Sequence, residues 1–444
     1  MQKNDIAEII INGMTDDGSG VGRYENLAVF VPYALLNEKV RVQIIKVKKS
    51  YAIGKLLEVI TPSEKRSKSD CEYFYQCGGC AYRNADYEEE LSYKWADVRD
   101  CIERIGKIEA DILPVLGGER CHYRNKAQFP VGVSGAGLYA RHSHRIIDTQ
   151  NCIIQNEDSV KILRAVKEFM QEEKVEGYNE ETHSGYIRNV YTRSGGGKTL
   201  VCIVTLTEDI PKKEKLIEKI KNTGVPLWGI VQNINSKRTN VVLGGQLKTL
   251  YGQDFMYDSI GDFKFKISPL SFYQVNPKQT KVLYDTVKKF LGDIKDKTVW
   301  DLYCGIGTIG QYSASEAKNL VGVEIIPEAV ENAKENAKLN KIKNSKYYVG
   351  AAEKLTDKLI KEGGKPYAVI LDPPRKGCDK ILLDTVAKVA PEKIVYVSCK
   401  ASTLARDLSY LKEKGYETEV IQPVDMFPGT PHIECVARLY RKVN

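Results

Sequence analysis

From residue 278 to the C-terminus, apolar runs that suit buried strands alternate with segments whose pattern suits helices. The strand-like runs are KTVWDLYC, NLVGVEI, YYVGA, YAVILDPP and KIVYVSC, and two further runs, ETEVIQPV and HIECVARLY, close the chain. Strands that alternate with helices form βαβ units, which build a parallel sheet. The sequence therefore predicts an α/β, Rossmann-like domain over residues 270–444.

Two other domains are expected before this one. Residues 1–60 hold short alternating apolar and polar runs separated by turn formers such as DDGSG, which is typical of a small β-barrel of the OB-like kind. A polar linker follows, and residues 61–269 mix strand-like runs with helix patterns, which indicates a central α+β domain. Within it, a helix over 86–106 is expected to be amphipathic and is a candidate to pack on the C-terminal domain, since one face carries apolar residues: Leu91, Trp95, Val98, Ile102 and Ile105.

Positive charge is concentrated in two stretches, although the net charge of the 444-residue chain is only +8. Residues 39–68 hold nine Lys or Arg and two acids, and residues 120–145 hold five Lys or Arg and no acid. Such clustering suits a polyanion, although a solvated surface with chance clustering is the simpler alternative. No apolar stretch approaches the ~18 residues of a membrane span, and the N-terminus lacks signal-peptide features. We therefore expect a cytoplasmic protein that makes no membrane contact.

A glycine-rich turn follows the first strand of the C-terminal domain. It reads DLYCGIGTIG, with Gly305, Gly307 and Gly310 in the pattern G-x-G-x-x-G between a strand and a helix. Glycines let the backbone approach a ligand closely, and Glu324 ends the next strand, where a carboxylate can accept hydrogen bonds from a ribose. Dinucleotide enzymes and S-adenosylmethionine (SAM) methyltransferases share this pattern, so by itself it does not choose between them.

Two later strands end in residues that carry chemistry. The fourth ends in Asp372-Pro373-Pro374, a rigid turn at the edge of the sheet where open α/β folds bind ligands. This motif is usual in methyltransferases that act on nucleobases, although a structural Pro-Pro turn is the alternative. The fifth ends in Ser398-Cys399, just before a helix start. A lone cysteine is usually a small buried hydrophobe, but amide N–H groups at a helix start can favour a thiolate.

With these residues in view, the chain resembles the RNA uracil-5-methyltransferases, in particular those that act on bacterial 23S ribosomal RNA. The resemblance covers almost the whole chain through motifs that match in order: C-x5-C-x2-C at 71–80, SFYQVNP at 271–277, DLYCGIGTIG at 301–310, VGVE at 321–324, DPPRKG at 372–377, SC…TLARD at 398–407 and PHIE at 431–434. It implies a TRAM-type RNA-binding barrel, a central domain with an iron–sulfur motif and a SAM methyltransferase domain. The chain departs from the family at Lys400-Ala401, where an Asn-Pro or Asp-Pro type dipeptide is usual. It also departs at Ala351-Ala352-Glu353, which lacks the first acid often found in SAM enzymes.

The resemblance also assigns roles to individual positions. It implies that SAM is contacted by the residues that match the family's cofactor motifs, Gln274, Tyr303, Gly305, Gly307, Glu324 and Asp372. It implies Cys399 as the nucleophile and Glu434 as the base. It further implies that four cysteines, Cys71, Cys77, Cys80 and Cys152, hold a [4Fe–4S] cluster. From spacing alone, four thiolates would suit structural zinc equally well.

The chemistry of uracil methylation explains why these groups would be needed. Carbon 5 of uracil is a poor nucleophile, but addition of a thiolate to carbon 6 turns the ring into an enolate. After methyl transfer the carbon-5 proton must leave, and a carboxylate within reach can remove it. Stacking in a duplex hides this edge of the ring, so the uridine must be flipped into the pocket from a loop.

The sequence thus predicts a SAM-dependent enzyme whose partner is a loop of 23S ribosomal RNA with a flipped uridine, and no obligatory protein partner is inferred. One alternative is the same reaction on transfer RNA. Another is a non-catalytic RNA-binding or redox-sensing iron–sulfur protein, and a third is an NAD-type oxidoreductase. Phe129 and Tyr139 are candidates to stack on bases, although core packing is the more usual role of such residues.

Overall fold

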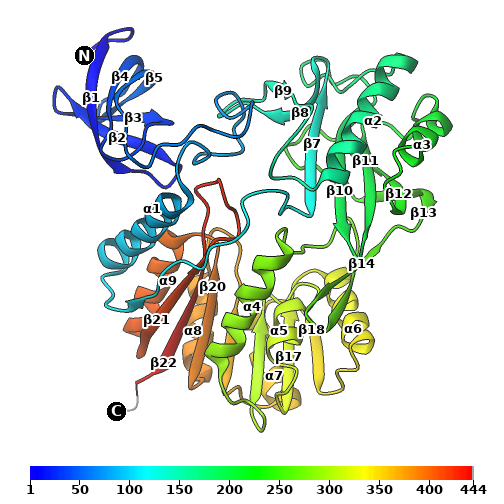
Figure 1. Cartoon of the computed structure of the whole chain (residues 1–444). Coiled ribbons are helices and arrows are strands. Elements are labelled where there is room, and N and C mark those ends of the chain that lie inside the picture. The colour runs from blue at the N-terminus through cyan, green and yellow to red at the C-terminus, as the bar shows by residue number, and fades with distance from the viewer. Residues whose placement is uncertain (443–444) are drawn as a thin grey trace.

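The computed structural model describes residues 1–442, which fold into three bodies (Figure 1). A small barrel holds the N-terminus, a central domain lies across from it, and a larger α/β domain lies below both in this view. No helix among residues 1–442 is long and apolar enough to cross a bilayer.

The N-terminal body is a closed barrel with the strand order β1-β2-β3-β5-β4. Its strands are β1 (Ile6–Met14), β2 (Ser19–Tyr24), β3 (Leu27–Pro32), β4 (Lys39–Val47) and β5 (Tyr51–Thr61). Alternate residues of a strand point to opposite faces. On β1, Ala7, Ile9 and Ile11 are therefore buried in the barrel, whereas Ile10 is 63% exposed. The period-two pattern of the sequence thus accounts for the barrel.

The amphipathic helix connects the barrel to the C-terminal domain. It consists of α1 (Tyr87–Asp100) and a π-helical segment, Cys101–Gly106. Val98 and Ile102 are buried in one core with Leu404 and Ala405 of the C-terminal domain. Ile105, which the helical pattern places on the same face, is instead 52% exposed. A π-helix has more residues per turn than an α-helix, so the apolar face no longer continues in register.

The central domain is built on a sheet of seven strands in the order β13-β12-β11-β10-β7-β8-β9. The strands are β7 (Lys126–Gly132), β8 (Gly135–Tyr139), β9 (Ile146–Asp148), β10 (Ile187–Gly195), β11 (Lys198–Thr205), β12 (Leu227–Ile234) and β13 (Gln246–Gly252). Helices α2 (Glu157–Glu173) and α3 (Lys213–Lys221) pack on one face of the sheet. Phe129 is fully buried in this core, so it is not available to stack on a base.

The C-terminal domain contains an eight-stranded sheet in the order β18-β17-β16-β19-β20-β22-β21-β6. Its strands are β16 (Thr298–Leu302), β17 (Asn319–Glu324), β18 (Ser345–Val349), β19 (Ala368–Leu371), β20 (Lys393–Ser398), β21 (Tyr416–Val424) and β22 (Glu434–Arg441), with β6 (Asp111–Ile112) at the edge. A hairpin of β14 (Met256–Ile260) and β15 (Phe263–Ile267) precedes it. Strand β22 runs antiparallel to both neighbours. The strands predicted from residues 270–444 therefore form one sheet. Its edge strand β6, however, comes from residues 111–112, which precede that range.

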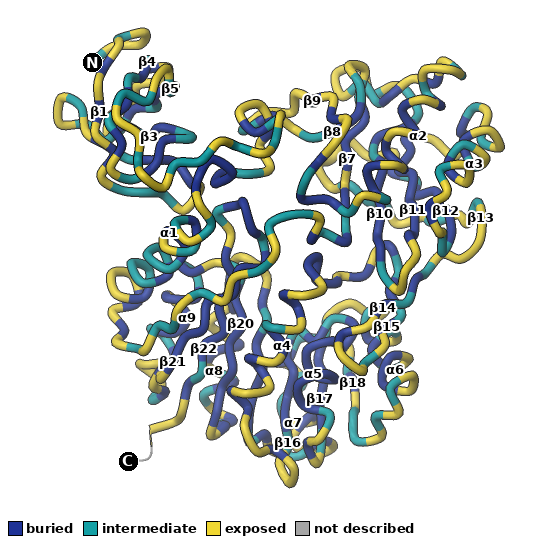
Figure 2. The backbone as a smooth tube through the Cα atoms, viewed as in Figure 1, coloured by how far each residue is buried: buried dark blue, intermediate teal, exposed yellow. Residues whose placement is uncertain are grey.

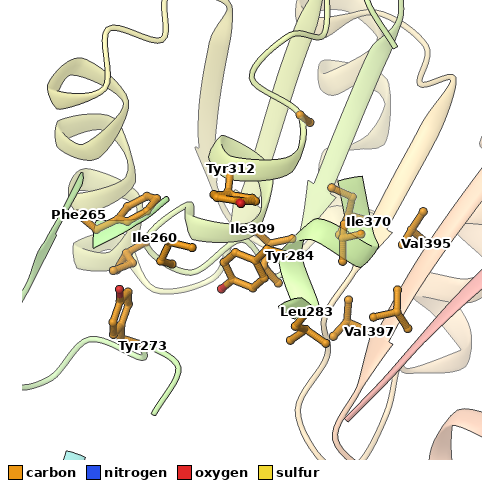
Figure 3. Close-up of a cluster of buried hydrophobic side chains, with 14 of the residues drawn as sticks. Ile260, Phe265, Tyr273, Leu283, Tyr284, Ile309, Tyr312, Ile370, Val395 and Val397 are labelled. Carbon is orange, nitrogen blue, oxygen red and sulfur yellow. The ribbon is translucent and has the colours of Figure 1, made fainter. Parts of the chain in front are cut away.

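Helices cover both faces of this sheet. They are α4 (Pro277–Leu291), α5 (Thr308–Ser313), α6 (Pro327–Leu339), α7 (Ala352–Gly363), α8 (Lys380–Val389) and α9 (Ala401–Glu413). Figure 2 shows the strands of the sheet as a nearly continuous buried layer. On one face, Leu283 and Tyr284 of α4 pack beside Ile370 and Val395 (Figure 3). This rigid layer fixes the ends of the strands, where the candidate site lies.

Candidate active site

Cys399, Asp372 and Glu434 come together because the chain leaves or enters the sheet at one edge. Cys399 follows β20, Asp372 follows β19, and the two strands are parallel neighbours. Glu434 opens β22, which runs antiparallel to β20, so its start lies beside the end of β20. The register places Cys435 opposite Ser398. A thiol and two carboxyl groups from three segments thus share one site.

The electrostatics of this group are set mainly by burial. Burial raises the pKa of the Cys399 thiol to about 11, and the nearby carboxyl groups of Glu434 and Asp372 add to the rise. Burial also raises the pKa of Glu434 well above its usual value, with a further contribution from Asp372. The pKa of Asp372 is raised to about 7 by burial. In the RNA-free protein, these shifts favour a neutral thiol and a protonated Glu434.

The expected lowering of the Cys399 pKa by a helix start is therefore not found. Helix α9 begins at Ala401, with Lys400 as its N-cap, so the thiol precedes the helix rather than capping it. Desolvation and two carboxyl groups outweigh the lowering effect of the Arg375 guanidinium on the thiol pKa. A thiolate at Cys399 requires further positive charge or a hydrogen-bond donor near the sulfur.

Arg375 is a cation that the sequence analysis did not assign. Its charge lowers the pKa values of both Cys399 and Glu434, and its guanidinium lies 3.5 Å from Nε2 of His432. Burial and the charge of Arg375 lower the pKa of His432 to about 4, so this imidazole is neutral at physiological pH. The signal was present in the sequence, since Arg375 follows Asp372-Pro-Pro in the DPPRKG motif.

The TLARD segment on α9 holds the loop that carries Arg375. Thr403 Oγ1 donates to the Arg375 carbonyl at 3.2 Å, and the Arg406 guanidinium donates to the Lys376 carbonyl at 2.8 Å. Asp407 Oδ2 accepts from the Cys378 N–H at 2.8 Å and from the Tyr396 hydroxyl at 2.6 Å. These contacts explain why the two motifs occur together: α9 fixes the loop after β19.

A cavity of about 280 Å³ opens beside Cys399. Its walls come from segments far apart in the sequence, and its lining includes Asp16, Asp97, Cys101, Arg375, Lys400 and His432. Burial and the nearby Asp16 and Asp100 raise the pKa of Asp97 to about 6. Sequence reasoning missed Asp16 and Asp97, because nothing in the barrel turn or in the helix pattern indicates that they meet Cys399.

The loop that leads to Glu434 is anchored by buried charges. Lys94 Nζ lies 2.7 Å from Glu90 Oε1 and 2.7 Å from Asp425 Oδ1, and all three side chains are fully buried. The Gly429 N–H donates to Glu90 Oε1 at 2.6 Å, and the Gly429 carbonyl accepts from the Ala81 N–H at 2.8 Å. Breaking such a buried pair typically costs about 3–5 kcal/mol. Helix α1 and the cysteine loop therefore fix the segment before β22.

The glycine-rich turn lies between β16 and α5 at the same edge of the sheet. Tyr303, Gly305 and Gly307 have φ values of 69°, 54° and 84°, in the left-handed region that glycine tolerates best. No other atom lies within 4 Å of the position of a Cβ added at Gly305, so this part of the turn faces open space. Glu324 accepts hydrogen bonds from the N–H groups of Gly305 at 3.2 Å and of Ile325 at 2.7 Å.

The motif SFYQVNP positions Gln274 and starts α4. Asn276 caps the helix, since its Oδ1 accepts from the Gln279 N–H at 3.3 Å, and its Nδ2 donates to the Met426 carbonyl at 3.1 Å. Gln274 is buried. An adenosyl ligand would suit this site. The turn at 303–307, open at Gly305, lets the ligand approach the backbone closely, and the nearby carboxylate can accept hydrogen bonds from the ribose.

The four motif cysteines lie in one region of the central domain. Cys80 packs against the buried cluster that contains Cys152 and Tyr123, and Cys77 bridges Ala140 in an antiparallel pairing. Burial raises the pKa of Cys77 to about 11, with smaller contributions from Cys152 and Cys71. Within residues 1–442, however, no three His, Cys, Asp or Glu side chains are grouped closely enough to hold a metal ion. The structure thus shows neighbouring thiols but not a formed metal site.

Two family models match this chain, one over the barrel and one over the rest of the fold. The model described as tRNA (Uracil-5-)-methyltransferase matches residues 86–442. The chain belongs to this family. It is accordingly a SAM-dependent RNA (uracil-5-)-methyltransferase, and the TRAM domain model matches residues 2–57, the barrel. The predicted TRAM-type barrel and SAM methyltransferase domain are confirmed.

Full-length relatives agree with this family. A protein of Halalkalibacterium halodurans named "Uncharacterized RNA methyltransferase" is 47% identical over 100% of this chain and 98% of its own. A protein of Clostridium tetani with the same name is 45% identical over 98% of this chain and 96% of its own. The solved structure of Pyrococcus abyssi tRNA (uracil-54, C5)-methyltransferase with S-adenosyl-L-homocysteine is 26% identical, with a TM-score of 0.80 over 97% of this chain and 99% of that one.

Proposed function

We propose that this protein methylates carbon 5 of a flipped uridine in 23S ribosomal RNA through a covalent bond between Cys399 and carbon 6. The observation that carries the mechanism is the meeting of Cys399, Glu434 and Asp372 at one edge of the sheet, beside a cavity and the glycine-rich turn. In the family to which the chain belongs, this edge would hold both the methyl donor and the base.

In the proposed reaction, the Cys399 thiolate adds to carbon 6, and the electron pair of the C5–C6 double bond moves into an enolate. Carbon 5 then attacks the SAM methyl group, and S-adenosylhomocysteine leaves with the electron pair of the broken S–CH₃ bond. Glu434 as carboxylate removes the carbon-5 proton, and the resulting enolate expels the thiolate, which restores the double bond. The cycle is redox neutral, since the only net transfer is a methyl cation in exchange for a proton.

The raised pKa values of Cys399 and Glu434 mean that nearby positive charges must help to deprotonate these groups. Because burial raises the pKa values of Cys399 and Glu434, binding of the substrates must favour the deprotonated form of each group. Arg375 already favours the thiolate, and the sulfonium of SAM would bring a second positive charge near Asp372. Gln274, Tyr303, Gly305, Gly307, Glu324 and Asp372 are the residues we assign to SAM, with the turn at Gly305 facing open space.

The RNA is assigned to the ribosome on the strength of the motif set and the C-x5-C-x2-C segment. Transfer RNA is the second candidate, because the Pyrococcus abyssi structure is named for a transfer RNA position and matches the same architecture over nearly its full length. The overall fold of the barrel and of the central domain therefore does not distinguish the two substrates. The positive charge of the protein does not distinguish them either, since ribosomal RNA and transfer RNA are both polyanions.

Mapping of 5-methyluridine in a deletion strain tests the assignment. We expect at least one 5-methyluridine to disappear from 23S ribosomal RNA, while transfer RNA keeps its full content, as measured by mass spectrometry of nuclease fragments. Complementation with the wild-type gene should restore the modification, and complementation with Cys399→Ala should not. Loss confined to transfer RNA would support the second candidate, and no loss in either RNA would contradict both.

We further propose that Cys71, Cys77, Cys80 and Cys152 hold a [4Fe–4S] cluster. Four soft thiolates suit such a cluster, and their loops already lie together through the Cys77–Ala140 pairing and the packing of Cys80 near Cys152. When bound, the cluster would supply a cross-link between the 71–80 loop and residue 152, and the methylation needs no electron from it. This cross-link would brace Ala81, whose N–H holds the Gly429 carbonyl.

Metal analysis of anaerobically purified protein tests the cluster. We expect a brown protein with iron and acid-labile sulfide in equal amounts, and we expect Cys152→Ser to lose both. Cys121→Ser is the control, because Cys121 is a partly buried thiol of the same region that lies outside the motif, and this variant should retain the iron. Stoichiometric zinc in a colourless protein, or full iron in Cys152→Ser, would refute the assignment.

A further inference from the structure

A second, larger groove continues from the cavity beside Cys399. Its volume is about 770 Å³, and its walls come from the barrel turn, the cysteine loop and residues 138–144 of the central domain. Asp16, Pro431 and His432 line both this groove and the Cys399 cavity. The two hollows therefore meet at these residues and form one path, with Cys399 at one end.

Two stacked aromatic rings form part of the far wall of the groove. The rings of Tyr139 and His144 lie 5.4 Å apart between centroids, with an interplanar angle of 28°. Tyr139 is 45% exposed, unlike the buried Phe129 on the neighbouring strand. Most tyrosines of a folded core are covered, so an exposed, stacked ring in a groove has one face available for another flat group.

The backbone around Tyr139 is held in place by the cysteine loop. The Gly78 N–H donates to the Tyr139 carbonyl at 2.9 Å, and Cys77 pairs with Ala140. A Cβ at Gly78 would lie 2.9 Å from the Arg141 Cα, so the two segments are in close contact. His144 is oriented by Glu180, whose carboxylate lies 3.0 Å from the imidazole Nδ1. The backbone that carries this platform, the Tyr139–His144 ring pair, is therefore held in place by the cysteine loop.

The charges along the groove are compatible with a nucleic-acid strand. Asp17, an acid on the barrel side, is paired with Arg141, whose Nη2 lies 3.1 Å from the carboxylate and 2.9 Å from the Asp17 carbonyl. His142 and Arg145 are exposed beside the platform. Pairing with Arg141 offsets the charge of Asp17, while Asp16 also lines the groove, and the exposed Arg145 attracts phosphates.

We propose that the Tyr139–His144 pair stacks on an unpaired base of the RNA strand that delivers the target uridine to Cys399. This inference rests on the proposed function and names the subsite next to it. Stacking tolerates any base, because every base has a π-face. A base held at the far end of the groove would keep the strand extended past Pro431 and His432. In an extended strand, the neighbouring uridine would not stack on its own neighbours.

The test uses binding and crosslinking of a 12-nucleotide oligouridine by the full-length protein. Tyr139→Ala should weaken binding about 5- to 160-fold, the range for loss of one base–aromatic stack. Tyr139→Phe should bind as the wild type does, since the ring is kept. Tyr251→Ala is the matched control, because Tyr251 on β13 is similarly exposed at 42% but lies outside the groove. Its binding should not change.

A second variant and a direct readout keep the test independent of folding. His144→Ala alters an exposed side chain and should also weaken binding, while SAM should stabilise every variant as it does the wild type in thermal shift. With 5-iodouridine in the oligonucleotide, light should crosslink the RNA to the peptide that contains Tyr139 and His144. Unchanged binding in Tyr139→Ala and His144→Ala, or crosslinks only outside residues 138–144, would overturn the inference.

Failure of the stacking subsite can be distinguished from failure of the proposed function. If wild-type protein transfers no methyl group to ribosomal or transfer RNA, the proposed function fails, whatever the binding data show. If it methylates RNA but Tyr139→Ala keeps the wild-type KM and kcat and the wild-type oligouridine affinity, only the stacking subsite fails. A rise in KM with unchanged kcat at saturating RNA supports the subsite.

Discussion

Replacing Cys399 with alanine is expected to lower RNA methylation by about 10⁴-fold or more, the scale seen when an enzyme loses its nucleophile. The physical reason is that carbon 5 of uracil cannot attack SAM until a thiolate has added to carbon 6. The measurement is transfer of labelled methyl from SAM to in vitro-transcribed 23S ribosomal RNA. Binding of SAM should be unaffected, because we assign the cofactor to the turn after β16 and not to the thiol.

A second thiol in the same cavity gives the matched control. Cys101 lines the pocket with Cys399, and both are partly buried. Its pKa is raised to about 12 by burial and by the charges of Asp97, Asp16 and Asp100, which together outweigh the lowering effect of Lys400. Cys101→Ser should therefore keep most of the turnover. If Cys101→Ser lost methylation while Cys399→Ala retained it, the nucleophile would have been assigned to the wrong residue.

Replacing Glu434 with glutamine is expected to lower turnover by about 10²- to 10⁴-fold, the usual contribution of a general base. The amide has nearly the same shape but cannot remove the carbon-5 proton. Methyl transfer should still occur once, so the protein should accumulate as a covalent complex with methylated RNA. Denaturing gel electrophoresis with labelled SAM measures this complex directly.

The control for Glu434→Gln is a carboxylate on the adjacent strand. Glu417 on β21 forms a surface ion pair with Lys442, and its side chain is 66% exposed. Glu417→Gln should leave both turnover and the amount of complex unchanged. Failure of Glu434→Gln to accumulate the complex, together with wild-type turnover, would show that another group removes the proton. Asp372 would then be the next candidate, because its charge raises the Glu434 pKa.

Much of the C-terminal domain could be predicted from the sequence, because each buried strand is a short apolar run and each connection has a helical pattern. The same logic predicted that Asp372 and Cys399 share an edge, since the carboxyl ends of parallel strands meet there. Glu434 was the harder case. It joins them because β22 is antiparallel, so its first residue, and not its last, lies at that edge.

The rest of the site depends on contacts between distant segments, which no local pattern encodes. Asp97 on α1 lines the Cys399 cavity because α1 packs against α9, and Asp16 in a barrel turn joins it because the barrel packs on α1 near Tyr93. The pKa of Cys399 could not be predicted for a related reason. The position of the thiol before a helix suggested a thiolate, but burial and two carboxyl groups dominate in the folded protein.

The most direct test of the central claim is a search for the bond between Cys399 and carbon 6 of uracil. RNA that contains 5-fluorouridine should trap this bond in the presence of SAM, since fluorine cannot leave as the proton does. Mass spectrometry of the digested complex should then find a fluorinated, methylated nucleotide on the peptide that carries Cys399. Active protein that yields no RNA-linked peptide, or that carries the nucleotide on another residue, would contradict the account.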